Sequence, residues 1–260
     1  MTFKIATWNV NSLRVRLPHV QAWMADAKPD VLALQEIKMP TEDFPHAAFA
    51  EMGYKAVVSG QRTYNGVAVI SKTEADDIIT DIPGLDDPQR RVLGVTVNGI
   101  RILDLYIPNG ESVGSEKYQY KLNWLNKLDS LLKSQLKKFP KMVILGDFNI
   151  APENIDVYDP KAWENSVLFS KAEHEAFQKM LGLGFKDCFR QLLPDEQSFS
   201  WWDYRMHAFR RKMGLRIDHI LASDALFPSC KSCLIDPEPR KWERPSDHAP
   251  VMAEFNLASL

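Results

Sequence analysis

The chain has 260 residues, of which 45% are hydrophobic and 25% are charged, and its formal net charge is −2. These values describe a globular protein that is long enough to bury a sizeable core, in one large domain or two small ones. The net charge excludes a protein that attracts its partner by an overall positive charge. A local basic patch can still exist on a chain with this net charge.

The apolar pattern predicts an alternation of strands and a few helices along the chain. Helical spacing of three and four residues predicts helices at residues 13–26, 116–139 and 171–181. Asn98-Gly99, between two strands, suits a tight hairpin turn, so the sheets contain antiparallel pairs. The strands predicted from apolar runs are residues 3–10, 31–34, 54–58, 66–71, 92–97, 100–107, 141–145, 199–202, 217–222 and 250–255.

These elements predict an α/β fold in which two mixed sheets pack together and helices cover them outside. No stretch resembles an interdomain linker, so we expect one domain over residues 1–260. No apolar run approaches the roughly 20 residues that span a bilayer, and the N-terminal residues enter a strand rather than a signal peptide. Three cysteines, an odd number, favour a reducing compartment. We therefore expect a cytoplasmic protein that does not act at a membrane.

Cys230 and Cys233 have a C-x-x-C spacing that occurs in zinc and redox sites. A structural zinc site needs two further ligands, and only Cys188 and dispersed histidines are available. We therefore expect these two side chains to flank a strand or lie within it.

Five short motifs carry the polar residues that indicate a function. Polar side chains at the ends of buried strands are costly unless they meet one another or bind something. Together they predict one catalytic floor that handles a metal and a phosphate. The motifs are residues 7–11 (TWNVN), 34–36 (LQE), 146–149 (GDFN), 216–219 (RIDH) and 245–248 (PSDH).

The donor atoms of these motifs are mainly oxygens, which suits Mg²⁺ or Mn²⁺ and not Zn²⁺. Glu36 closes a run of buried apolar residues, and Asn9 ends another strand, so both are candidate metal ligands. Asp247 is a further candidate ligand. Taken alone, Glu36 could equally be a solvated strand end.

His248 lies on a loop that prolines hold on both sides, and it is a candidate general base or acid. Asp218 is a natural partner to orient its ring. His219 follows Asp218 directly, so alternation directs it to the opposite face of the sheet.

Asp147 and Asn149 share a face if their strand continues. The first could hold or deprotonate a water, and the second could donate to a phosphoryl oxygen.

Two further features at the same edge have alternative interpretations. The segment Asp147–Asn149 could simply form a turn, and Tyr106 could place a phenolic donor in the site or serve only in packing. An aromatic cluster at 199–204 precedes five cations within 205–216. That combination is typical of contact with a nucleic-acid backbone and its bases or sugars, although a solvated loop would look similar.

The five motifs, in order and over essentially the whole chain, resemble the bacterial exonuclease III branch of the exonuclease–endonuclease–phosphatase superfamily. The resemblance implies a four-layered α/β sandwich (DNase I-like) and Mg²⁺-dependent hydrolysis of DNA phosphodiesters. Its members act as 3′→5′ exonucleases, as abasic-site endonucleases and as 3′-phosphatases or 3′-phosphodiesterases in base-excision repair. Double-stranded DNA with abasic sites or blocked 3′ ends is the implied partner, and a monomer is expected.

The resemblance also implies roles for single residues. Glu36 is implied as the main metal ligand, helped by Asn9 and Asp247. Asn11 stands where eukaryotic members often have Asp, and the loop 108–115 offers no cation to reach into a DNA groove. The other implied roles are water activation by Asp147, phosphate contact by Asn149, transition-state stabilisation or base catalysis by His248 with Asp218, an active-site tyrosine at Tyr106, a pocket for a flipped-out abasic sugar at Trp201 and Leu215, and DNA contact by Arg205, Arg210 and Arg211.

Two other functions compete with this one. The same catalytic floor could act on a small phosphoester such as an inositol phosphate or a lipid head group, which would have little use for the segment 199–216. A binding module without chemistry is the third class, and the intact set of polar motifs argues against it.

Overall fold

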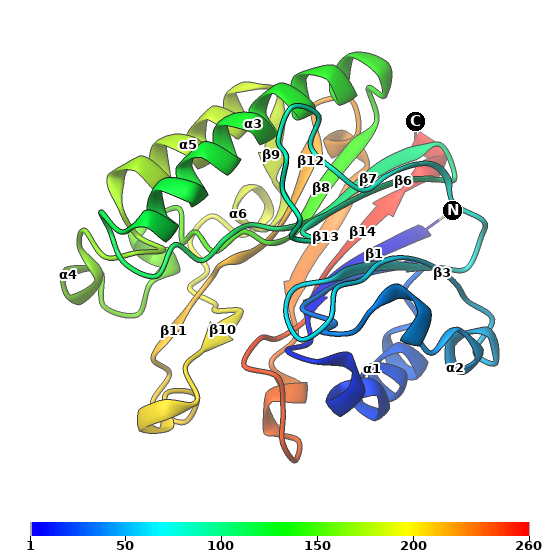
Figure 1. Ribbon diagram of the computed structural model, residues 1–260, viewed down its shortest axis with the longest axis horizontal. Helices are drawn as coiled ribbons and strands as arrows, with labels where there is room; N and C mark the ends of the chain where they lie inside the picture. Colours follow the sequence, from blue (N-terminus) through cyan, green and yellow to red (C-terminus); the bar gives the residue numbers. More distant parts are fainter. Residues whose placement is uncertain (1, 260) are drawn as a thin grey trace.

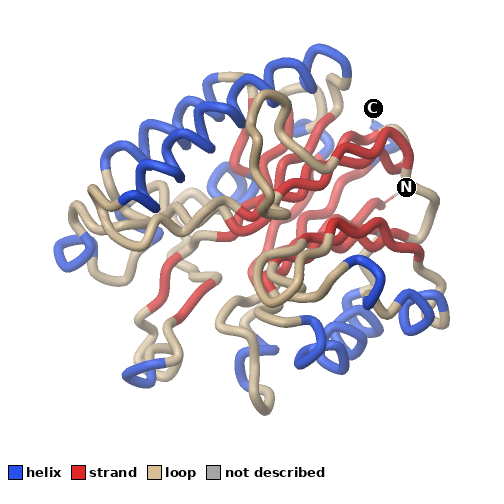
Figure 2. The backbone as a smooth tube through the Cα atoms, viewed as in Figure 1, coloured by secondary structure: helices blue, strands red, loops and turns tan. Residues whose placement is uncertain are grey.

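Two six-stranded sheets pack face to face in the computed structural model, which describes residues 2–259, and helices cover the outer side of each sheet (Figure 1 and Figure 2). The predicted four-layered α/β sandwich is therefore confirmed. In pairing order, the first sheet consists of β13 (Cys230–Ile235), β14 (Val251–Asn256), β1 (Thr2–Asn9), β2 (Val31–Gln35), β4 (Val67–Ser71) and β3 (Lys55–Ser59). The second consists of β5 (Asp76–Ile79), β6 (Val92–Val97), β7 (Ile100–Tyr106), β8 (Met142–Asp147), β12 (Asp218–Ser223) and β9 (Phe185–Asp187).

The helices divide between the two outer faces. Helices α1 (Leu13–Ala27) and α2 (His46–Ala50) lie on the first sheet, and α3 (Glu116–Lys138) and α5 (Lys171–Gly182) lie side by side on the second (Figure 1). Two short helices, α4 (Pro160–Trp163) and α6 (Cys188–Leu192), and six short 3₁₀ turns complete the described helices. Within residues 2–259, no helix is long and apolar enough to cross a lipid bilayer.

The sequence determines where the long helices begin and end. The Ser115 hydroxyl accepts the Tyr118 N–H at 3.1 Å at the start of α3, which ends before Pro140. At the start of α5, Ser170 and Glu173 form a reciprocal capping box. The predicted helices are confirmed to within one residue at each end.

Most predicted strands are confirmed, and those that were missed lie at sheet edges or are very short. The Asn98-Gly99 hairpin joins β6 and β7, with positive φ angles of 50° and 75°. The sequence did not predict β5 or β9, which are edge strands with polar residues or only three residues. The expectation that Cys230 and Cys233 flank a strand or lie within it is confirmed, because both lie in the edge strand β13. The strand predicted at 199–202 keeps only two residues, as β10 (Trp201–Trp202), which pairs with β11 (Gly214–Leu215) in a separate two-stranded ribbon.

Chain direction brings the motifs to one edge of the sandwich. β1 and β2 are parallel, as are β7 and β8, so their carboxyl ends lie together. β12 runs antiparallel to β8 and starts opposite its last residue, and β14 starts beside the end of β1. A common apolar core between the sheets holds these strands in place.

Candidate functional site

The five polar motifs meet where these strands end. One ligand atom each from Glu36, Asp147 and His248 lies within 4.8 Å of the others, which makes them the one group of this kind among the described residues. They come from three parts of the chain and from both sheets. The catalytic floor expected from the sequence therefore exists as a cluster of side chains.

Asn9 bridges the two carboxylates of this cluster. Its Nδ2 donates to Glu36 Oε1 at 2.8 Å and to Asp147 Oδ2 at 2.9 Å, and its Oδ1 accepts the Asn11 N–H at 3.0 Å. The Asn9 amide nitrogen thus faces the carboxylates, so the amide must turn over before its oxygen can face a cation. Two carboxylates converging from different sheets suit a hard divalent cation.

His248 is held between two carboxylates. Its Nδ1 lies 2.8 Å from Asp218 Oδ2, and its Nε2 lies 3.6 Å from Asp147 Oδ2. Burial alone would lower the pKa of His248, but Asp218 and then Asp147 outweigh it and raise the pKa to about 10. His248 is therefore an imidazolium at neutral pH in this arrangement.

The loop that carries His248 is fixed from both sides. The His248 N–H donates to Ser246 Oγ at 3.2 Å, and the Trp8 indole N–H donates to the His248 carbonyl at 3.1 Å. Ser246 Oγ in turn donates to the Asn9 carbonyl at 2.7 Å. These contacts fix the imidazole relative to the end of β1.

Gly146 precedes Asp147 and determines how closely the end of β8 approaches β7. Gly146 has a φ of 139°, and a Cβ there would lie 1.9 Å from the Leu105 carbonyl oxygen, so a glycine lets β7 and β8 approach. Burial raises the pKa of Asp147 to about 7, against the opposing charge of His248.

Asn149 does not continue the strand, so the condition under which it would share a strand face with Asp147 is not met. β8 stops at Asp147, and Asn149 has a left-handed φ of 49°. The alternative, a turn, is correct: the Asn149 N–H donates to Asp147 Oδ1 at 3.0 Å. The Asn149 side chain donates to the Ile107 carbonyl at 2.9 Å and accepts from Asn109 Nδ2 at 3.3 Å. Asn149 therefore still lies at the site.

Tyr106 and Lys38 flank Glu36. The pKa of Tyr106 is raised well above its usual value by burial and then by Glu36. Lys38, which the sequence did not single out, lies 3.3 Å from Glu36 Oε2 and donates to Asn11 Oδ1 at 2.6 Å. Its only signal in the sequence is its position two residues after Glu36.

Asp247 lies outside the cluster of Glu36, Asp147 and His248. Its Oδ2 accepts the Trp201 indole N–H at 3.0 Å, and its Oδ1 accepts from Asn11 Nδ2 at 3.2 Å. In this arrangement Asp247 orients Trp201 and Asn11 beside the floor.

The predicted DNA-contact residues fall into separate places. Trp201 and Arg205 line a pocket of about 400 Å³, whereas Arg210 and Arg211 line another groove with Trp202 and Lys241. Leu215 is fully buried behind Trp201, in an apolar cluster.

One of the five cations within residues 205–216 is not available to a ligand, because Arg216 is only 1% exposed. Its guanidinium lies 2.6 Å from Asp156 and 2.8 Å from Asp187. Charged side chains inside a protein need such partners. Arg216 therefore contributes to the interior and not to a binding surface.

Sequence reasoning also missed a buried ion pair behind the site. Lys121 and Glu173 are both fully buried and contact each other, and Lys121 Nζ donates to the carbonyls of Asn149 at 2.6 Å and Asn109 at 3.1 Å. A lysine on the apolar side of an amphipathic helix is the signal that could have found it.

Fold and site together define a metal-dependent phosphoesterase with a carboxylate and imidazole floor. Residues 6–248 match the Endonuclease/Exonuclease/phosphatase family, and the chain belongs to this family. It is 34% identical to the exodeoxyribonuclease III of Haemophilus influenzae over 97% of this chain and 99% of that protein. The predicted resemblance to exonuclease III and the class of enzyme, a hydrolytic nuclease, are confirmed.

Two solved structures have nearly the same fold. One is a 3′ phosphatase from Neisseria, NExo, bound to a product DNA hairpin: identity is 48%, the TM-score is 0.96, and 98% of this chain and 99% of that chain are covered. The other is an AP endonuclease from Archaeoglobus fulgidus, with 40% identity, a TM-score of 0.95, and coverage of 98% of this chain and 100% of that chain.

Proposed function

We propose that this protein is a Mg²⁺-dependent DNA-repair nuclease that hydrolyses phosphodiesters in double-stranded DNA at abasic sites or blocked 3′ ends. The observation that carries the proposal is the meeting of Glu36, Asp147 and His248 at one sheet edge, with Asp218 behind the imidazole. Relatives named as an exodeoxyribonuclease, a 3′ phosphatase and an AP endonuclease support the choice of DNA as substrate.

Glu36 would be the main ligand of the metal. Asp147 faces the same space and offers a second carboxylate, and Asn9 could contribute its oxygen once its amide turns over. We also propose that Asp247 supports the site through Asn11. A bound Mg²⁺, or Mn²⁺ in its place, supplies Lewis-acid polarisation of a phosphoryl oxygen and neutralises its charge.

The protein's own groups would accept a proton from the attacking water and stabilise the charge that develops on the phosphate. Asp147, with a pKa near neutrality, suits acceptance of a proton from the attacking water. His248 is protonated and oriented by Asp218, so it suits stabilisation of the negative charge that develops on the phosphoryl group. Asn149 and Tyr106 place an amide and a phenol at the same edge and would position the phosphate.

Residues beside the floor would hold the DNA. Trp201 borders the floor through Asp247 and would pack against a flipped-out abasic sugar, with Leu215 behind it. Asn11, Arg205, Arg210 and Arg211 would contact the DNA backbone. We further propose that the chain works as one domain and as a monomer, in the cytoplasm, where its three free cysteines stay reduced.

Incision of an abasic-site duplex with Mg²⁺, and again with EDTA, tests the chemistry. We expect incision that chelation abolishes; activity that survives EDTA would exclude this mechanism. A salt titration of duplex binding separates DNA from small phosphoesters, because only a polyanion releases many counterions and gives a steep slope.

A further inference from the structure

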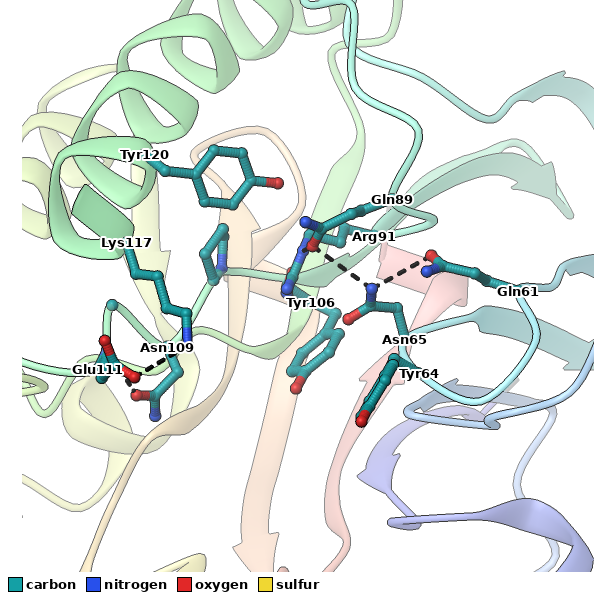
Figure 3. Close-up of a pocket in the computed structure, with 12 residues that line it drawn as sticks. Gln61, Tyr64, Asn65, Gln89, Arg91, Tyr106, Asn109, Glu111, Lys117 and Tyr120 are labelled. Atoms are coloured by element: carbon teal, nitrogen blue, oxygen red, sulfur yellow. Dashed lines mark hydrogen bonds and ion pairs between the residues drawn. The ribbon is translucent and has the colours of Figure 1, made fainter.

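A second hollow lies beside the catalytic floor, on the side away from Trp201. It has a volume of about 690 Å³, which is within the range of small-molecule sites. Three loops and the start of α3 form its walls (Figure 3). The lining residues used below are Gln61, Tyr64, Asn65, Gln89, Arg91 and Tyr106.

Strand order places this hollow next to the catalytic floor. Along the shared edge of the sheets, Trp201 pairs with the loop before β14, while the hollow is formed by the segments before β4, before β6 and after β7. The floor, at the ends of β1, β2 and β8, lies between them. A strand of DNA along this edge would therefore have one neighbouring nucleotide near Trp201 and the other in the hollow.

The hollow has two cations, both engaged within the protein, and Arg91 keeps its charge because its partners are neutral. Arg91 lies over the Tyr106 ring at 4.6 Å and donates to Gln89 Oε1 at 2.9 Å. Lys117 pairs with Glu111 at 2.9 Å. Beside these cations the hollow presents amide groups and aromatic rings, which are the groups that recognise nucleobases.

The amides form a connected group at the rim. Asn65 Nδ2 lies 3.2 Å from Gln61 Oε1 and 3.4 Å from Gln89 Oε1 (Figure 3). Asn65 is only 8% exposed, and its backbone has a left-handed φ of 56°. In Figure 3 the rings of Tyr64 and Tyr106 lie close to this group.

Tyr64 is a large exposed aromatic residue on a loop with left-handed backbone angles. The residue is 67% exposed, and Thr63 before it has a left-handed φ of 72°. Backbone strain of this kind at non-glycine residues persists where the surrounding structure enforces it, often at ligand sites. An exposed aromatic ring on such a loop is suited to stack on a base.

We propose that this hollow is a nucleoside subsite, which receives the base and sugar joined to the scissile phosphate on the side away from Trp201. The inference rests on the proposed nuclease function and adds to it a direct contact with one base. The base stacks on Tyr64 and its edge meets the amides of Gln61, Asn65 and Gln89. Cleavage would then depend on the base at that position.

The test uses an abasic-site duplex with 2-aminopurine in the nucleotide joined to the scissile phosphate on the side opposite the abasic sugar, and measures its fluorescence on binding without metal. We expect a change in fluorescence with the wild-type protein. Tyr64→Ala and Asn65→Ala should abolish that change. Tyr64→Ala should also weaken binding about tenfold, as loss of one stacked base does.

Leu234→Ala is the matched control, because Leu234 is also a large exposed side chain but lies on β13, outside the hollow. It should leave the signal unchanged. No change with the wild-type protein, or a change that survives both variants, would overturn the subsite. Incision of the same duplex with Mg²⁺ is measured in parallel: absence of incision would refute the proposed function, whereas incision without a base signal refutes only this inference.

Discussion

The buried pair of Lys121 and Glu173 gives a quantitative prediction, because it braces two loops of the site. Neither side chain is exposed, and the ammonium also donates to the carbonyls of Asn149 and Asn109. Lys121→Met leaves the Glu173 carboxylate buried without its cation and both carbonyls without this donor. We expect the free energy of unfolding to fall by about 3–5 kcal/mol, as for other broken buried pairs. Urea unfolding at neutral pH measures it.

Two further variants make this prediction specific. Lys133→Met is the control: Lys133 lies on the same helix and pairs with Asp129, but it is 59% exposed. That change should cost less than about 1 kcal/mol. The double variant Lys121→Met with Glu173→Gln should recover part of the loss, because no unpaired charge remains. Equal losses in Lys121→Met and Lys133→Met would refute the reasoning.

Three further predictions concern the floor, the approach of two strands and pH. Glu36→Gln should lower the turnover of an abasic duplex by several orders of magnitude with an unchanged melting temperature; near wild-type turnover would contradict the role of Glu36. Gly146→Ala should cost about 3 kcal/mol or more in urea unfolding, because its Cβ would meet the Leu105 carbonyl, whereas Gly182→Ala, with open space around it, should cost nothing. Burial and then Arg216 lower the pKa of His219 to about 4 from 6.5, so the unfolded chain binds more protons between these values. Stability should therefore fall by about 3 kcal/mol as the pH drops through this window, and His219→Gln should lack this part of the loss.

Much of the architecture could be predicted because it depends on local pattern. The apolar stripe between Ser115 and Pro140 predicts α3, and Asn98-Gly99 predicts the hairpin of β6 and β7. The meeting of Glu36, Asp147 and His248 could be expected, because carboxyl ends of parallel strands share an edge. The edge strand β5 was missed because none of its four side chains is buried, which removes the apolar signal.

The sequence by itself determined the class of fold, the family and the residue types of the floor, since these follow from pattern along the chain. Only the tertiary structure decided how individual polar groups are used. Arg216 turns inward because Asp156, sixty residues away, lies behind it. Asn9 turns its amide nitrogen to the two carboxylates because Asn11 holds its oxygen, and Lys121 is buried because Glu173 and two loop carbonyls surround it. A buried polar group takes whichever partner the fold brings near, and the cost of leaving it unpaired selects the arrangement.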